Sequence, residues 1–153
     1  MSLEKWAEHG WLRAEPASPE EIADLLGIVI RDLHDARVDA ISEDRRFEAA
    51  FNAARTAANV ALRACGYRTA TQLGHHLKTV ESLELTIQCD PRLIQKMRVF
   101  SKKRNATSYD SAGNVSDQEL DEVIKVADEL RQSVTVWLRE NHPELTKGLP
   151  QSE

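Results

Sequence analysis

Residues that could carry out chemistry gather in one stretch of the sequence, between Arg92 and Arg104. The stretch contains six basic residues and no acidic one, although the whole chain has a formal net charge of -5. The basic residues are Arg92, Lys96, Arg98, Lys102, Lys103 and Arg104. Such a run is either a solvated helix face whose cations stabilise the helix C-terminus, or a surface that binds phosphate groups.

Arg104 differs from the other basic residues because it continues an apolar stripe. The stripe recurs every three or four residues and consists of Ile94, Met97, Phe100 and Arg104. Side chains at this spacing share one face of a helix, so Arg104 should point where the apolar side chains point. A cation in that position needs a partner or a cleft. Arg104, the adjacent Asn105 and the nearby Tyr109 are therefore the leading candidates for a site.

The histidines and cysteines favour neither a metal site nor a catalytic pair. His75 and His76 are adjacent, and neighbouring residues on a helix point about 100° apart. We expect them to be polar residues at a helix start, with a role as ligands or bases as the alternative. Cys65 and Cys89 show no ligand spacing and are predicted to be small buried hydrophobic residues. No metal and no cofactor are predicted.

The elements that position the candidate residues are predicted to be helices. Glycine (6) and proline (5) are too scarce for a sandwich or barrel of many short strands. Capping signals place helix starts after Ser18, Ser42, Asp90 and Ser116, and Gly66 marks a helix end. The predicted helices cover residues 19–41, 43–65, 75–87, 91–106 and 117–141, with a short helix within residues 1–10. We predict an all-α, compact up-and-down bundle of five or six helices.

The predicted helix at residues 43–65 contains eight alanines, whose small side chains let neighbouring helices approach closely. We therefore predict that it lies near the centre of the bundle. Asn52, Arg55 and Asn59 form a polar stripe on this helix, and the sequence does not reveal what the stripe contacts. The domain is predicted to span residues 1–145, with a flexible tail at residues 146–153.

Three features together resemble a HEPN domain. They are residues 102–110 (KKRNATSYD), residues 51–54 (FNAA) on an alanine-rich helix, and one last capped helix. HEPN domains are compact helical bundles that usually form homodimers. Their best-known members are ribonucleases, often toxins or defence proteins, with an Arg-x4-6-His motif and a polar residue directly after the arginine. Arg104 and Asn105 match this motif, so the resemblance implies a helical fold and a homodimer.

The sequence departs from the ribonuclease motif at Tyr109, which stands where the shortest form of the motif has histidine. A histidine with a pKa of about 6.5 can accept a proton from a ribose hydroxyl at neutral pH, whereas a phenol with a pKa of about 10 stays protonated. Residues five apart on a helix also lie about 140° apart. Arg104 and Tyr109 therefore converge only if the helix ends between them or if two protomers each supply one. We expect metal-independent RNA cleavage to be lost.

The predicted function is a HEPN-like binding module that recognises a nucleotide, RNA or a nucleotidyltransferase-type partner. Its predicted binding residues are Lys102, Lys103, Arg104, Asn105 and Tyr109. One alternative is a metal-independent endoribonuclease of the toxin or defence type, with Arg104, Asn105 and Tyr109 as catalytic residues across a dimer. Another is a purely structural helical dimer. A nucleotidyltransferase encoded beside the protein, an arrangement common in the family, would favour a toxin–antitoxin system.

The expected location is the cytoplasm, with no membrane partner. The N-terminus lacks the uninterrupted apolar run of a signal peptide, and no stretch approaches the roughly 18 apolar residues of a membrane span.

Overall fold

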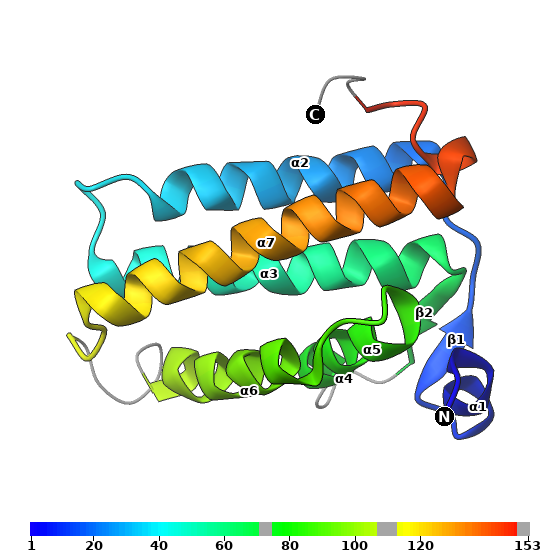
Figure 1. Cartoon of the computed structure of the whole chain (residues 1–153), viewed down its shortest axis with the longest axis horizontal. Helices are drawn as coiled ribbons and strands as arrows, with labels where there is room; N and C mark the ends of the chain where they lie inside the picture. The colour runs from blue at the N-terminus through cyan, green and yellow to red at the C-terminus, as the bar shows by residue number, and fades with distance from the viewer. Residues whose placement is uncertain (71–74, 107–112, 150–153) are drawn as a thin grey trace.

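Helix α3 (Glu43–Ala64) runs through the middle of a helical bundle, with α2 (Pro19–Ala36) and α7 (Asp117–Asn141) beside it (Figure 1). Helix α6 (Pro91–Asn105) packs against α3 from another side. The structure is a computed structural model that describes residues 1–70, 75–106 and 113–149. The predicted all-α bundle is confirmed.

The central position of α3 follows from its alanines. Ala53, Ala57, Ala58 and Ala61 are fully buried. Because these side chains are so small, α2 and α7 both pack closely on α3. Larger side chains of α3, among them Phe47 and Val60, fill the space between the helices. The prediction of a central alanine-rich helix is confirmed.

The predicted capping residues begin and end the long helices. The Ser18 hydroxyl accepts a hydrogen bond from the Glu21 backbone N–H at 3.1 Å. Ser116 and Glu119 bond to each other's backbone N–H groups and form a complete capping box. Gly66 follows α3 with a φ of +87°, a left-handed conformation that glycine adopts readily. Local sequence signals therefore fix where these helices stop and start.

Helix α2 ends at Ala36 rather than near Ile41, so the predicted end of this helix is wrong. Arg46, from the first turns of α3, donates a hydrogen bond from Nε to the Ala36 carbonyl at 2.8 Å. This contact satisfies a carbonyl that the end of a helix leaves without a partner. Ala40, which the sequence pattern places on the buried face, is exposed in the turn that follows.

The single helix predicted at residues 75–87 is two short helices, α4 (His75–Glu81) and α5 (Leu83–Thr86). Ser82 lies buried between them, and its hydroxyl donates to the Thr79 carbonyl at 2.6 Å. A serine that bonds to the backbone in this way competes with the regular helical hydrogen bonds. The break therefore has a local cause.

Two short strands, which the sequence analysis did not predict, join the N-terminal segment to the bundle. Strand β1 (Leu12–Ala14) pairs antiparallel with β2 (Tyr67–Thr69), with Arg13 opposite Arg68. They lie at one end of the bundle beside the short helix α1 (Leu3–Glu8) (Figure 1). Strands of three residues are too short to show a period in the sequence.

A fully buried arginine anchors the same end of the bundle. Arg63 is 1% exposed, and its guanidinium donates to both carboxylate oxygens of Glu21, at 2.7 and 3.0 Å. It also donates to the backbone carbonyls of Glu15, Pro16 and Tyr67. The hydrogen bond from Arg63 is the main cause that lowers the pKa of Glu21 below its usual value. One side chain therefore ties together α2, α3, β2 and the segment that follows β1.

The chain continues past α7 through a short 3-10 helix, η2 (Pro143–Leu145), whose Leu145 is buried. Leu149, in the segment predicted to be a tail, packs against the hydrophobic core. Residues 150–153 lie outside the described residues. None of the described helices combines the length and apolar composition that crossing a bilayer requires.

Candidate functional site: two arginines at the end of α6

Arg104 occupies the position that its place in the apolar stripe predicts. Ile94, Met97 and Phe100 of α6 are buried against the bundle, and the Phe100 ring meets the Phe47 ring edge to face at 5.9 Å. One turn further along α6, the guanidinium carbon of Arg104 lies 6.0 Å from the centre of the Phe51 ring. At this distance the guanidinium is attracted to the ring face. Arg104 is therefore held over α3, half-buried.

Arg55 brings a second positive charge to the same place. It follows Phe51 by one turn of α3, so both side chains lie on one face of that helix. Burial lowers the pKa of Arg55 below its usual value, and the nearby charge of Arg104 lowers it further, whereas Asp32 raises it. We call Arg55 and Arg104 the arginine pair.

A hydrogen-bonded chain from α2 orients Arg55. Asp32 of α2 is 6% exposed and accepts hydrogen bonds from Arg31, at 3.1 Å, and from the side-chain amide of Asn52. The carbonyl oxygen of the Asn52 side chain in turn accepts a hydrogen bond from Arg55. The polar stripe on α3 therefore faces α2 through Asn52 and the α6 terminus through Arg55.

Sequence reasoning missed Asp32 and did not place Arg55 in the site. A signal was present for each of them. Asp32 stands three residues after Val29 and four before Ala36, on the buried face of α2, where a carboxylate needs partners. Arg55 lies in the polar stripe of an otherwise buried alanine helix. Only the structure shows that the two belong to one network.

Most of the other basic residues of α6 form ion pairs on the surface of the bundle. Lys96 lies 3.5 Å from Glu122 and Lys103 lies 3.3 Å from Glu119, both on α7. Arg98 contacts Glu81 of α4 at 2.9 Å, and the exposed Arg92 contacts Asp90. Lys102 is exposed to solvent. The structure therefore divides the basic run. Lys96, Arg98 and Lys103 pair with neighbouring helices, Arg92 pairs with the N-cap residue of α6 itself, and Arg104 turns toward α3.

The remaining predicted site residues are described only in part. Asn105 is exposed, and its side-chain oxygen accepts a long hydrogen bond of 3.5 Å from the Arg104 guanidinium group. Tyr109 lies outside the described residues, as do the side chains of His75 and His76. Asp128 of α7 contacts Arg131 at 3.2 Å and Arg37 at 3.9 Å. Cys65 and Cys89 are half-buried, and burial raises the pKa of each thiol.

Comparison with known protein families matches residues 22–139 to the HEPN domain. The matched segment is more than three quarters of the chain. The chain belongs to the HEPN family. The matched segment begins within α2 and ends within α7, so it contains Asp32, Asn52 and the arginine pair. No curated protein and no solved structure matches the chain in the corresponding searches.

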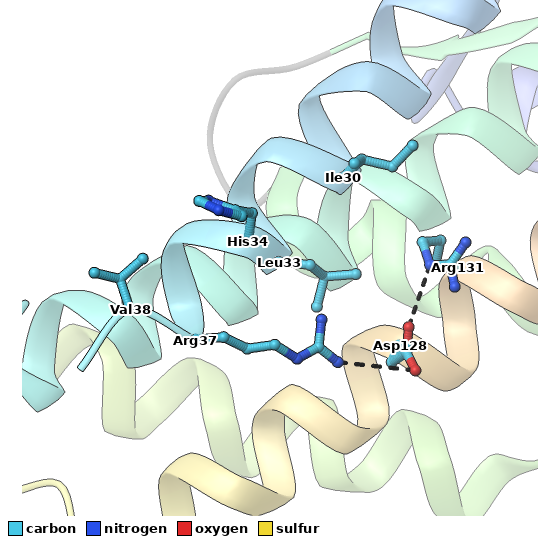
Figure 2. Close-up of a pocket in the computed structure, with 7 residues that line it drawn as sticks. All are labelled: Ile30, Leu33, His34, Arg37, Val38, Asp128 and Arg131. Atoms are coloured by element: carbon cyan, nitrogen blue, oxygen red, sulfur yellow. Dashed lines mark hydrogen bonds and ion pairs between the residues drawn. The ribbon is translucent and has the colours of Figure 1, made fainter.

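A second feature of this HEPN domain is an open groove of about 410 Å³ between α2 and α7 (Figure 2). Leu33 lines it from α2, Arg37 and Val38 line it from the segment that follows α2, and Asp128 and Arg131 line it from α7. Its two arginines converge on the Asp128 carboxylate. None of the predicted site residues contributes to this groove. Among the described residues, no cluster of histidine, cysteine and carboxylate side chains is suited to hold a metal ion.

Proposed function

We propose that this HEPN domain binds RNA through Arg104, with Lys102, Lys103, Asn105 and Tyr109 around it, and that it does not cleave the RNA. The observation that supports the proposal is the arginine pair. Arg104 lies over the Phe51 ring, Arg55 follows Phe51 by one turn of α3, and both side chains are half-buried in a chain whose net charge is -5. Guanidinium groups bind phosphate oxygens in a bidentate manner, and their attraction is stronger where water is partly excluded.

RNA suits the surroundings of the pair better than a small inorganic anion does. The exposed Lys102 offers a further cation to a phosphate backbone, and Asn105 offers an amide to hydrogen-bond with a base or a ribose. The homodimer expected from the family resemblance remains a prediction. So does the nucleotidyltransferase-type partner.

The first expected result is that purified protein leaves single-stranded RNA intact in the presence of a chelator. The motif offers Tyr109 in place of a histidine, and a phenol is protonated at neutral pH. Incubation with end-labelled RNA and gel electrophoresis measure the outcome. Cleavage that disappears in both Arg104→Ala and Tyr109→Phe would establish the ribonuclease alternative instead. Cleavage that survives both changes would point to a contaminating enzyme.

The second expected result is salt-dependent RNA binding that requires Arg104. Each phosphate contact releases counterions, so the affinity should fall as salt rises, with a log–log slope of about -0.7 per contact for single strands. Arg104→Ala should lower the affinity by tenfold or more, and Lys102→Ala by only about two- to threefold. Lys103→Ala should have less effect still, because Glu119 already neutralises that side chain. Fluorescence anisotropy titrations at several salt concentrations measure these affinities.

Arg92→Ala is the matched control, since it removes one cation from the other end of α6. Arg92 is 90% exposed and pairs with Asp90, so its loss should change neither the affinity nor the melting temperature. Two results would show that the basic run is structural. One is an RNA affinity that does not change with salt concentration, and the other is an Arg104→Ala variant with a lower melting temperature and an unchanged RNA affinity.

A further inference from the structure

We infer that Glu119 of α7 competes with RNA for Lys103 of α6, and that this ion pair limits how tightly the domain binds RNA. The inference rests on the proposed function and deepens it, because it names a residue that regulates the affinity of the same site. Lys103 stands next to Arg104 in the last turn of α6. Its ammonium group lies 3.3 Å from the Glu119 carboxylate.

The two carboxylate oxygens of Glu119 have different partners. Oε1 accepts a hydrogen bond from the Ser116 backbone N–H at 3.0 Å, and Oε2 lies 3.3 Å from Lys103 Nζ. The Glu119 backbone N–H donates in turn to the Ser116 hydroxyl at 3.1 Å, which completes the capping box of α7. The carboxylate is therefore held beside Lys103 by the start of α7, and not by the lysine alone.

The Glu119 carboxylate is charged at neutral pH. The hydrogen bond from the Ser116 backbone is the main cause that lowers its pKa below the usual value, and the contact with Lys103 lowers the pKa further. A phosphate group that approaches Lys103 meets this fixed negative charge, which repels the phosphate and already shares the cation that the phosphate needs. The carboxylate and the phosphate therefore exclude each other at Lys103.

The ion pair is weak enough for RNA to displace it. The Lys103 and Glu119 side chains are 26% and 41% exposed. Ion pairs that water reaches in this way contribute little to stability. The preceding residue, Lys102, is exposed, and the proposed function expects a larger effect from it. Glu119 is therefore the reason why two adjacent lysines should contribute unequally to RNA binding.

The test measures the affinity of the full chain for labelled single-stranded RNA, in the wild type and in Glu119→Gln. Glutamine removes the charge but keeps an acceptor oxygen for the Ser116 N–H, and capping boxes accept glutamine at this position. The affinity should rise about two- to threefold, which is the contribution expected of Lys102. The log–log slope against salt should steepen by about 0.7, because one more phosphate contact forms.

The decisive measurement is whether the gain depends on Lys103. Lys103→Ala alone should change the affinity little, whereas Lys103→Ala introduced into Glu119→Gln should remove the whole gain. Such a dependence measures the coupling between the two side chains. A general increase in positive charge would instead raise the affinity with or without Lys103.

Two control variants separate the charge of Glu119 from its other effects. Glu129→Gln makes the same change of charge at an exposed residue ten positions further along α7, and it should leave the affinity unchanged. Ser116→Ala weakens the cap of α7 but keeps the Glu119 charge, so it should lower the melting temperature without raising the affinity. A melting curve checks that each variant is folded.

The outcomes separate this inference from the proposed function. An unchanged affinity in folded Glu119→Gln would overturn the competition and leave RNA binding in place. A gain that persists without Lys103, or an equal gain in Glu129→Gln or Ser116→Ala, would also overturn it. A wild-type chain that binds no RNA at any salt concentration would overturn the proposed function and this inference together.

Discussion

Replacing Arg63 with alanine is expected to destabilise the domain by about 3–5 kcal/mol, because the change empties the space of a side chain that is 1% exposed and removes the partner of Glu21, which is 33% exposed. The variant leaves the Glu21 carboxylate and three backbone carbonyls without the donor that serves them all. Buried polar groups that lose their hydrogen bonds keep the full cost of desolvation. Urea unfolding monitored by circular dichroism measures the loss.

Arg68→Ala is the matched control for Arg63→Ala. Arg68 also pairs with Glu15, at 2.6 Å, and lies 3.5 Å from Glu21, but it is 41% exposed. Exposed pairs contribute about 1 kcal/mol or less, so this variant should stay close to wild type. Equal losses in the two variants would contradict the assignment of Arg63 as the buried anchor.

The pH dependence of stability gives a second measurement on Arg63. The folded state lowers the pKa of Glu21 below its unfolded value of about 4.3, mainly through the Arg63 hydrogen bond. The folded state therefore binds fewer protons than the unfolded state in this range. The resulting stabilisation is present above the unfolded pKa and disappears as the pH falls through the folded pKa. Arg63→Ala should weaken this acid sensitivity below about pH 5.

Replacing Phe47 with alanine is expected to cost about 3–5 kcal/mol, because it opens a cavity where α3 meets α6. Phe47 is fully buried and its ring meets Phe100 edge to face. This contact holds α6 on α3, and the same two helices supply the arginine pair. Unfolding by urea measures the cost, and the RNA affinity of the folded fraction should fall as well.

Two control variants make the Phe47 result specific. Phe47→Leu keeps most of the buried volume and should cost less than about half as much. Val99→Ala removes an exposed apolar side chain from α6 and should change stability by no more than about 0.5 kcal/mol. A small effect of Phe47→Ala would mean that the neighbouring helices close over the space and that α6 is held by its ion pairs.

Local sequence patterns were sufficient to predict the helical fold and most of its boundaries. Ser18, Ser116 and Gly66 act through hydrogen bonds and dihedral angles within a few residues, so their effects can be read directly from the chain. The end of α2 could not be predicted in this way. At that end the Ala36 carbonyl accepts a hydrogen bond from Arg46, a residue ten positions later, and a local pattern does not reveal such a contact.

The sequence by itself also determined one half of the candidate site. The spacing of apolar residues along α6 is a local property, and it predicted that Arg104 lies on the side of the helix that carries Ile94, Met97 and Phe100. The family resemblance rested on the same segment, and the family is confirmed. Whether Tyr109 belongs to the site stays a prediction.

Tertiary structure alone decided the other half of the candidate site, which comes from α2 and α3. Asp32, Asn52 and Arg104 stand on three different helices, and their sequence separations carry no record of their distances in space. The alanines of α3 bring these helices close together, and only then does Asn52 reach Asp32 while Arg104 settles over Phe51. The spacing of apolar residues along each helix can be read from the sequence, but the way in which helices face one another depends on packing between distant segments. That packing decided which cation lies near Arg104.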